Sequence, residues 1–267
     1  VIICFDGKGG SSKRRKLFPE YKANRKVRKR LTRLNSFNSQ EDESISMKNQ
    51  ILRLTQYLDT LPITVLAPEN IEADDSMAYI SQQVYPQSQF YIMSTDKDFL
   101  QLVDDRVQVW SPTKKKYYFK DTVLEDYEIP AHNFLLYRTL KGDQSDNIPG
   151  IRGVGVKTLK SRIPMLFEDK KVSVDDLLDF VKNSNDTSKV IKQISKSGDM
   201  IRLNYELMQL NNVDINGHVK SHIIDVVKKP INRLVKYKFQ KMMLEDKTYT
   251  AIKNPDFSRN MLYQTPQ

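Results

Sequence analysis

The chain has 267 residues, of which 39% are hydrophobic and 28% charged, a balance typical of a globular protein that excludes a disordered tail. No apolar run approaches the roughly 20 residues of a bilayer span, and no charged-then-apolar leader suggests secretion. The single cysteine, Cys4, excludes internal disulfides and fits a reducing compartment. We therefore expect a cytoplasmic protein with no membrane partner.

One segment carries the whole net charge of +10. Between Lys13 and Arg33 there are eleven Lys and Arg residues and one acid, Glu20, so this segment alone sums to +10 and the rest to about zero. A concentrated basic block is typical of an element that binds a polyanion, because neutralising phosphates releases counterions. Nucleic acid is the expected partner.

The first 60 residues predict a strand and two helices. Residues 1–5 form an apolar, β-branched run that ends at Asp6, which indicates a buried strand. Basic residues recur at helical spacings from residue 13 to about 35, and this helix has few apolar positions to bury, so we expect it to stand largely free. A polar, acidic loop is predicted at 36–46, followed by a helix whose apolar face includes positions 47 to 58.

Two more strands are predicted at 63–67 and 90–94, with a helix carrying Met77 and Ile80 between them. This alternation of strands and helices predicts a parallel sheet flanked by helices. A short helix at 99–103 and a hairpin follow, and beyond about residue 125 the pattern is helical. The predicted domains are an α/β core over 1–120 and a helical lobe over 121–267. The predicted hairpin strands are 107–111 and 116–119, and the later helices are 133–140, 156–163, 174–181 and 199–210.

Acidic residues follow the carboxyl ends of all three predicted strands. In an open parallel sheet these ends share one edge, so the acids are expected to converge. Packed carboxylates repel one another unless a cation neutralises them, and oxygen ligands suit Mg²⁺ or Mn²⁺. An Asp after a strand is also commonly a helix cap, but capping accounts poorly for the whole set. The set is Asp6, Glu72, Asp74, Asp75, Asp96 and Asp98.

A second acidic pair, Asp143 and Asp146, could complete a second metal position, and two ions together can activate water and stabilise a leaving oxygen. The glycine-rich run at 150–158 nearly mimics a nucleotide-binding P-loop, but Lys157 comes one residue late and no strand precedes it. We expect instead a turn whose backbone amides contact a DNA phosphate.

Together these motifs resemble the 5′-nuclease family, which includes the flap endonucleases, and especially its phage 5′-exonuclease and ribonuclease H-type members. The resemblance covers the chain to about Leu210. It implies a PIN-like, resolvase-like core with a helical arch at about 13–46, and a helix-three-turn-helix at about 142–163 that grips duplex DNA and holds a monovalent cation. The motifs are IEADD at 71–75, STDKD at 94–98, GDQSDN at 142–147 and the turn at 150–158.

The resemblance also implies residue roles. Asp6, Glu72, Asp74 and Asp96 would serve one metal site, and Asp98, Asp143 and Asp146 the second. Lys22 and Arg25, at the base of the arch, would meet the scissile phosphate, and Tyr21 would stack on a base. The further expected DNA contacts are Lys26, Arg30, Gly153, Gly155, Lys157 and Thr158.

The activity that this implies is hydrolysis of phosphodiesters at 5′ flaps, 5′ ends or RNA primers, on DNA or an RNA–DNA hybrid, during replication or repair. Two Mg²⁺ ions, replaceable by Mn²⁺, and a monomer in a bacterial or phage-infected cell are expected, with a single-strand-binding protein as partner. Family members begin with an earlier strand that ends in a metal-binding aspartate, and this sequence starts after that point, through truncation or true loss. The alternatives are therefore a non-catalytic branched-DNA-binding module and an RNA-cutting enzyme of the PIN-type fold.

Overall fold

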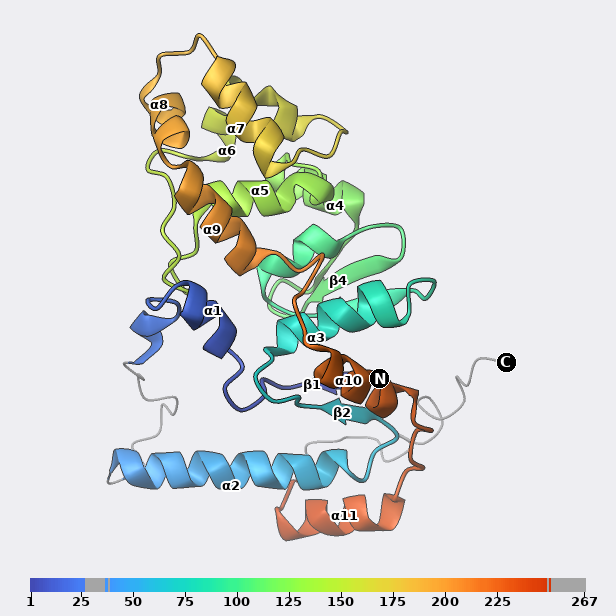
Figure 1. Ribbon diagram of the computed structural model, residues 1–267. Helices are drawn as coiled ribbons and strands as arrows, with labels where there is room; N and C mark the ends of the chain where they lie inside the picture. Colours follow the sequence, from blue (N-terminus) through green and yellow to red (C-terminus); the bar gives the residue numbers. More distant parts are fainter. Residues whose placement is uncertain (27–36, 38, 249, 251–267) are drawn as a thin grey trace. The chain divides into compact units, whose positions relative to one another are not determined.

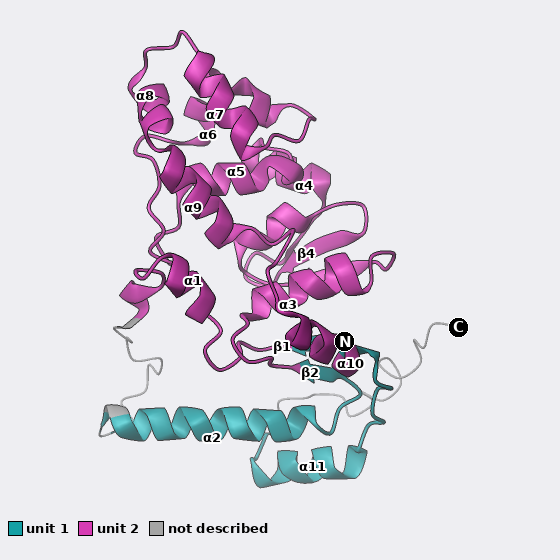
Figure 2. Ribbon diagram, viewed as in Figure 1, with its two compact units in different colours: residues 1–3, 32–65, 227–267 teal, residues 4–31, 66–226 magenta. Residues whose placement is uncertain are grey.

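The computed structural model describes residues 1–26, 37, 39–248 and 250. They divide into two compact units, shown in Figure 2, and each is discontinuous in the sequence. The predicted domain boundary near residue 120 stays a prediction. None of the helices in the described part of the chain is long and apolar enough to cross a membrane. Unit 1 comprises 1–3, 32–65 and 227–267, and unit 2 comprises 4–31 and 66–226.

The predicted strands are all present, in two sheets. β3 (Phe90–Met93) pairs in parallel with β4 (Val107–Ser111), which pairs antiparallel with β5 (Lys116–Tyr118), so the hairpin is confirmed. The first three predicted strands do not form one parallel sheet, because they are divided between the two sheets. β1 (Ile2–Cys4) and β2 (Thr64–Leu66) form a separate two-stranded sheet. Alternate residues of β4 are buried, as expected for a strand with one face against the core.

Unit 2 has its core where helices cover the three-stranded sheet (Figure 1). The 3-10 helix η3 (Lys97–Leu102) packs against β4 and α5 (Ala131–Lys141), and α5 packs in turn on α9 (Gly198–Met208). Phe99 and Phe134 are fully buried there. The other helical segments of unit 2 are α3 (Ala73–Tyr79), η2 (Ile80–Val84), α4 (Lys120–Tyr127), α6 (Val156–Arg162), η4 (Pro164–Phe167), α7 (Val174–Asn183) and α8 (Lys189–Lys196), and α10 (Gly217–Lys228) begins there.

The basic segment differs from the single long helix that was predicted. α1 (Ser12–Leu17) ends at Phe18, which is extended, and the only other helix before residue 27 is one 3-10 turn, η1 (Ala23–Lys26). The reason is Pro19, because a residue before proline is disfavoured in the helical region. The prediction of a continuous helix is therefore wrong before residue 27, and Arg30 lies outside the described residues.

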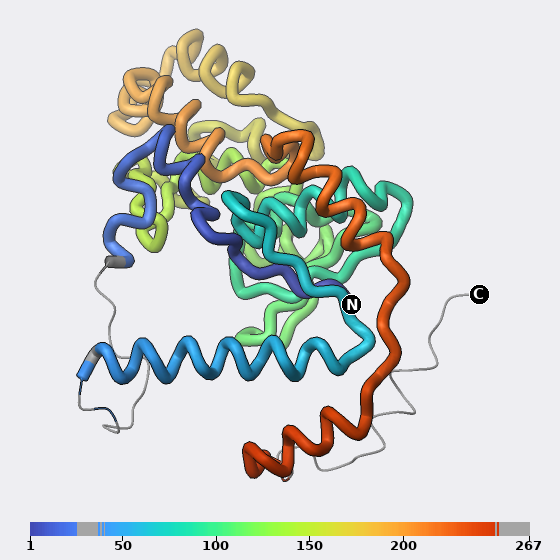
Figure 3. The backbone as a smooth tube through the Cα atoms, turned by 60° about the horizontal axis from the view of Figure 1, so that its bottom comes forward, coloured from blue at the N-terminus to red at the C-terminus, as the bar shows by residue number. Residues whose placement is uncertain are grey.

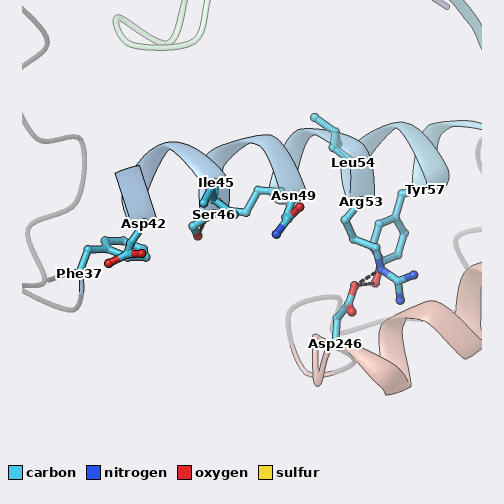
Figure 4. Close-up of a pocket in the computed structure, with 10 residues that line it drawn as sticks. Phe37, Asp42, Ile45, Ser46, Asn49, Arg53, Leu54, Tyr57 and Asp246 are labelled. Carbon is cyan, nitrogen blue, oxygen red and sulfur yellow. Dashed lines mark hydrogen bonds and ion pairs between the residues drawn. The ribbon is translucent and has the colours of Figure 1, made fainter. Parts of the chain in front are cut away.

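In unit 1, α2 (Gln40–Leu58) lies beside α11 (Lys236–Glu245) in both Figure 1 and Figure 3. Arg53 Nε donates to Asp246 Oδ2 (2.7 Å) and Tyr57 Oη to the same oxygen (2.8 Å), while the Tyr57 ring contacts Phe239 edge-on. Figure 4 shows Arg53, Tyr57 and Asp246 at one end of a hollow along α2, which has a volume of about 700 Å³.

The predicted loop at 36–46 is wrong over most of its length, because α2 begins at Gln40. Ser39 Oγ accepts a hydrogen bond from the Asp42 backbone N–H (3.0 Å) and caps the helix. Glu41, Asp42 and Glu43 occupy the first turn, where the helix dipole favours negative charge. The acidic run that suggested a loop is thus a helix start.

Candidate active site

Two of the predicted metal ligands cap helices. Asp6 Oδ1 accepts from the backbone N–H of Ala73, the first residue of α3 (2.8 Å). Asp96 Oδ1 accepts from the Asp98 N–H at the start of η3 (2.8 Å). A cap engages one carboxylate oxygen, and the second can still serve a cation. Asp6 is therefore fixed by its hydrogen bond to α3, and Asp96 by its hydrogen bond to η3.

Glu72 is the centre of a first buried cluster. Arg14 donates to Glu72 Oε2 (2.5 Å) and to both carboxylate oxygens of Asp75 (2.7 and 2.8 Å), and Lys22 Nζ lies 2.5 Å from Glu72 Oε1. Glu72 itself is 3% exposed. Burial acts to raise the pKa of Glu72, but Arg14 and Lys22 outweigh it and hold that pKa below its usual value. Glu72 is therefore ionised at neutral pH.

Arg138 organises a second cluster. Its Nε donates to Asp98 Oδ1 (2.7 Å), and its guanidinium also pairs with Asp143. Burial raises the pKa of Asp98 to about 6 in spite of Arg138. The pKa of Asp143 is lowered, because the hydrogen bonds from Ser145 and the charge of Arg138 together outweigh its burial. Two acids that the sequence places 45 residues apart thus share one buried cation.

The pKa of Asp74 is affected by residues of the first cluster and by Asp96. Burial, and after it the charge of Asp96, raises the pKa of Asp74 to about 7. Asp96 also acts to raise the pKa of Asp98. The charge of Asp96 thus acts to raise the pKa of two neighbouring carboxyls, and a divalent cation relieves repulsion of this kind.

The base of the predicted arch contacts these acids directly. Tyr21 Oη lies 3.2 Å from both Glu72 Oε2 and Asp146 Oδ2, and Lys22 N–H donates to the Asp146 carbonyl (2.8 Å). The Arg25 guanidinium pairs with the Asp146 carboxylate. Tyr21 is 3% exposed and packs in the core with Leu135, and its stacking on a base stays a prediction.

A tight glycine-closed loop presents Asp143 and Asp146. The backbones of Asp143 and Ile148 exchange two hydrogen bonds (2.9 and 2.8 Å). Gly142 has φ +73°, and a Cβ at Gly150 would lie 1.8 Å from the Lys141 carbonyl oxygen, so no larger residue fits there. The motif at 142–150 is therefore a structural unit that fixes both acids.

The residues predicted to contact DNA after this loop lie around the start of α6. Gly153 has φ +83°, and Gly155 is the N-cap of α6 with open space where a Cβ would be. Lys157 is exposed in the first turn, next to the half-buried Thr158. Lys26 belongs to η1. Their contacts with DNA stay predictions.

Four of the predicted metal ligands form ion pairs with basic side chains: Glu72, Asp98, Asp143 and Asp146. Among residues 1–26, 37, 39–248 and 250, no three His, Cys, Asp or Glu side chains form a group that could hold a metal ion. Arg14, Lys22 and Arg138 supply the neutralising charge. The donors nevertheless suit a hard divalent cation, since all are carboxylate oxygens and two have a raised pKa. The assignment of the seven metal ligands stays a prediction.

Sequence reasoning gave no role to Arg14 and Arg138, and it counted Asp75 among the converging acids without giving it a metal site. Arg14 stands in a run of four basic residues, and nothing in the sequence tells which of them turns inward. Arg138 did carry a signal, because a lone charge within the apolar helix of 131–141 requires a buried partner. Asp75 belongs to the motif at 71–75, and its bidentate pairing with Arg14 gives it a structural function.

Comparison with known proteins shows which sequences and structures this chain is similar to. Residues 1–128 match the model of the 5′-3′ exonuclease N-terminal resolvase-like domain. A 5′-3′ exonuclease of Mycoplasmopsis pulmonis is 27% identical over 258 residues, which are 92% of this chain and 80% of that protein. A 5′-3′ exonuclease of Buchnera aphidicola is 33% identical over 159 residues, 59% of this chain and 50% of its own.

The fold is also that of a solved protein. The T5 D15 protein, crystallised with metal ions, has a TM-score of 0.64 and 22% identity, and the match covers 91% of this chain and 83% of that one. The T5 D15 flap endonuclease in a complex with DNA and metal ions gives a TM-score of 0.61 at 21% identity, covering 92% and 84%. Residues 1–128 are thus similar to the 5′-3′ exonuclease N-terminal resolvase-like domain, and these matches, with the motifs at 71–75, 94–98 and 142–147, support the 5′-nuclease family for this chain.

Proposed function

We propose that this protein is a metal-dependent, structure-specific 5′-nuclease that hydrolyses phosphodiesters of 5′ flaps, 5′ ends or RNA primers at duplex junctions. One observation carries the proposal: Tyr21, Lys22 and Arg25 of the basic segment lie directly against Glu72 and Asp146. Phosphate-binding cations beside a group of acids are what phosphodiester hydrolysis requires.

The acids and the cations have separate tasks in this proposal. Bound divalent ions supply a hydroxide nucleophile near neutral pH and stabilise the leaving oxygen, and Mn²⁺ accepts the same oxygen ligands as Mg²⁺. Lys22 and Arg25, here paired with Glu72 and Asp146, carry the charges that neutralise the scissile phosphate. The first Mg²⁺ would be held by Asp6, Glu72, Asp74 and Asp96, and the second by Asp98, Asp143 and Asp146.

Composition and relatives support a nucleic-acid substrate with a free 5′ end. The net charge of +10 is concentrated in the segment from Lys13 to Arg33, which favours a polyanion. The curated relatives are named 5′-3′ exonucleases, and the T5 D15 flap endonuclease has been crystallised with DNA. We extend the proposal to a monomer that grips the duplex through the turn at 150–158, with a monovalent cation on its backbone, and that works beside a single-strand-binding protein.

A 5′-labelled flap substrate tests the proposal. The wild-type protein with Mg²⁺ is expected to release short 5′ fragments, and EDTA to abolish them. The double variant Asp143→Asn, Asp146→Asn should lose at least about a hundredfold in rate, more than the loss usual for residues that only support a metal ligand. The matched control removes two acids from α7, Asp175→Asn and Asp179→Asn, and should cleave at the wild-type rate.

The alternative of a non-catalytic branched-DNA-binding module has one observation in its favour. Arg14, Lys22 and Arg138 already neutralise the acids, so the clusters need no metal ion to be stable. The same assay separates the two functions. Flap binding by the wild-type protein without Mg²⁺-dependent product would favour the binding module and contradict the nuclease proposal.

A further inference from the structure

A small cavity is lined in part by Asp96, outside the two carboxylate clusters. Its volume is about 140 Å³, and it is formed where the carboxyl ends of β3 and β4 meet the turn into β5. The lining residues that matter here are Ser94, Asp96, Ser111, Thr113, Lys114 and Tyr118. Hydroxyl side chains and Lys114 thus line part of a space that also has Asp96 in its wall.

Lys114 provides the positive charge of this cavity. Its Nζ donates to Tyr118 Oη (2.7 Å) and lies over the rings of Tyr118 and Tyr127, 5.4 and 5.6 Å from their centroids. Asp126 is 3.9 Å away but pairs more closely with Lys116 (2.7 Å). Lys114 is thus held by one long ion pair and one hydrogen bond, and its side chain is 48% exposed, so an anion can approach its ammonium group.

The hydroxyl groups favour the same kind of ligand. Ser111 Oγ and Thr113 Oγ1 lie 3.3 Å apart, and Ser94 Oγ accepts from the Asp96 N–H (3.1 Å), which leaves its own proton to donate. Lysine with serine, threonine and tyrosine hydroxyls is the usual set of phosphate contacts in nucleic-acid complexes. A volume of 140 Å³ suits one phosphate group and is well below the roughly 300 Å³ of a site for a larger organic ligand.

We propose that this cavity is a phosphate subsite for the nucleic-acid strand that is cut, with Lys114 as its cation. The proposal rests on the proposed function and adds a second phosphate position to it. Asp96 belongs both to the cavity wall and to the predicted metal ligands, so a phosphate bound here lies next to the scissile one. The phosphate is either an internal diester or the terminal 5′-monophosphate, and the experiment distinguishes these sources.

Binding without cleavage tests the subsite. A fluorescein-labelled 5′-flap DNA is titrated in EDTA with the wild-type protein, with Lys114→Gln and with the control variant Lys115→Gln. Lys115 is the matched control because it is exposed, is next to Lys114 in the sequence and lies outside the cavity. Lys114→Gln is expected to raise the Kd about threefold to tenfold and to reduce the slope of log K against log salt by about 0.9, the value for one phosphate. Lys115→Gln should leave both unchanged.

Single methylphosphonate substitutions then locate the phosphate. The wild-type protein should bind less tightly when one particular phosphate is made neutral. The Lys114→Gln variant should bind that modified DNA and the unmodified DNA with the same affinity. Comparing 5′-phosphorylated with 5′-hydroxyl DNA shows whether that phosphate is terminal. If Lys114→Gln melts at a lower temperature than the wild-type protein, Thr113→Val is used in its place. That variant removes a hydroxyl group of the cavity and keeps Lys114.

Two results would overturn the subsite. One is an equal effect of Lys114→Gln and Lys115→Gln, which would indicate diffuse charge attraction. The other is the same loss at every neutralised phosphate. Both can occur in a protein that cleaves the flap with Mg²⁺, so the subsite can fail while the nuclease proposal stands. Conversely, a protein that shows the Lys114 effect and never cleaves would contradict only the nuclease proposal.

Discussion

Arg138 illustrates what a single residue does in this protein. It is 8% exposed on α5 and joins Asp98 to Asp143, so its charge compensates two partly buried carboxylates at once. Removing one partner of a buried ion pair leaves an uncompensated charge, which costs more than the pair itself contributes.

Arg138→Met is therefore expected to lower the free energy of unfolding by about 3 kcal/mol in EDTA. Added Mg²⁺ should restore more stability to this variant than to the wild-type protein, because Asp98 and Asp143 then lack their cation. Urea unfolding followed by circular dichroism, with and without Mg²⁺, measures both effects. The control is Arg202→Met, which breaks the exposed pair with Asp175 and should change stability by less than about 1 kcal/mol.

That acids would follow the strands could be predicted from the sequence, but their ion pairs with Arg14 and Arg138 could not. Asp6 and Asp96 follow strands, as their positions in the sequence indicated, although β1 and β3 belong to different sheets. Arg14 lies 58 residues from Glu72, and only the fold brings the two together. Tyr21 was expected to contact DNA. The sequence around it does not predict that Tyr21 packs in the core beside Leu135.

At the scale of elements, α5 organises the helical part of unit 2 through Asn133, which is fully buried. Its Nδ2 donates to the carbonyls of Leu166 (3.2 Å) and Lys170 (2.9 Å), and its Oδ1 accepts from the Val172 N–H (2.9 Å). One side chain thus satisfies the backbone of a segment that is neither helix nor strand over most of its length.

Asn133→Ala is expected to destabilise the protein by about 3 kcal/mol, since it leaves several buried backbone groups without partners. Thermal unfolding of the variant beside Asn183→Ala, an exposed asparagine at the end of α7, measures the difference. A loss in Asn133→Ala no larger than that in Asn183→Ala would show that water replaces these hydrogen bonds.

Helices and strands could be predicted where the residue types of the segment itself determine its secondary structure. The strands at 63–67 and 90–94 and the hairpin came from β-branched runs and turn residues. The basic segment was misjudged, because its helical spacing was given more weight than Pro19, the residue that ends α1. The start of α2 was missed because acids that suit a loop also suit the first turn of a helix.

At the scale of the whole molecule, the two compact units have separate sets of internal contacts. Regions with separate contacts can open separately, so their hydrogen exchange need not change together. In unit 1 the carboxyl-terminal α11 is tied to α2 through Arg53, which pairs with Glu245 (2.8 Å) and Asp246 (2.7 Å). The acids and cations of the candidate site all belong to unit 2.

Arg53→Ala is therefore expected to speed the amide exchange of α11 by about fivefold, the scale of a partly exposed ion-pair network, and to leave α5 unchanged. Hydrogen exchange read by mass spectrometry measures both helices in one experiment. Because Tyr57 keeps its hydrogen bond to Asp246 and its ring contact with Phe239, α11 should exchange faster without detaching. Equal acceleration in α5 would contradict this picture, because it would mean that the two units open as one and that loss of Arg53 also reaches the carboxylate clusters of unit 2.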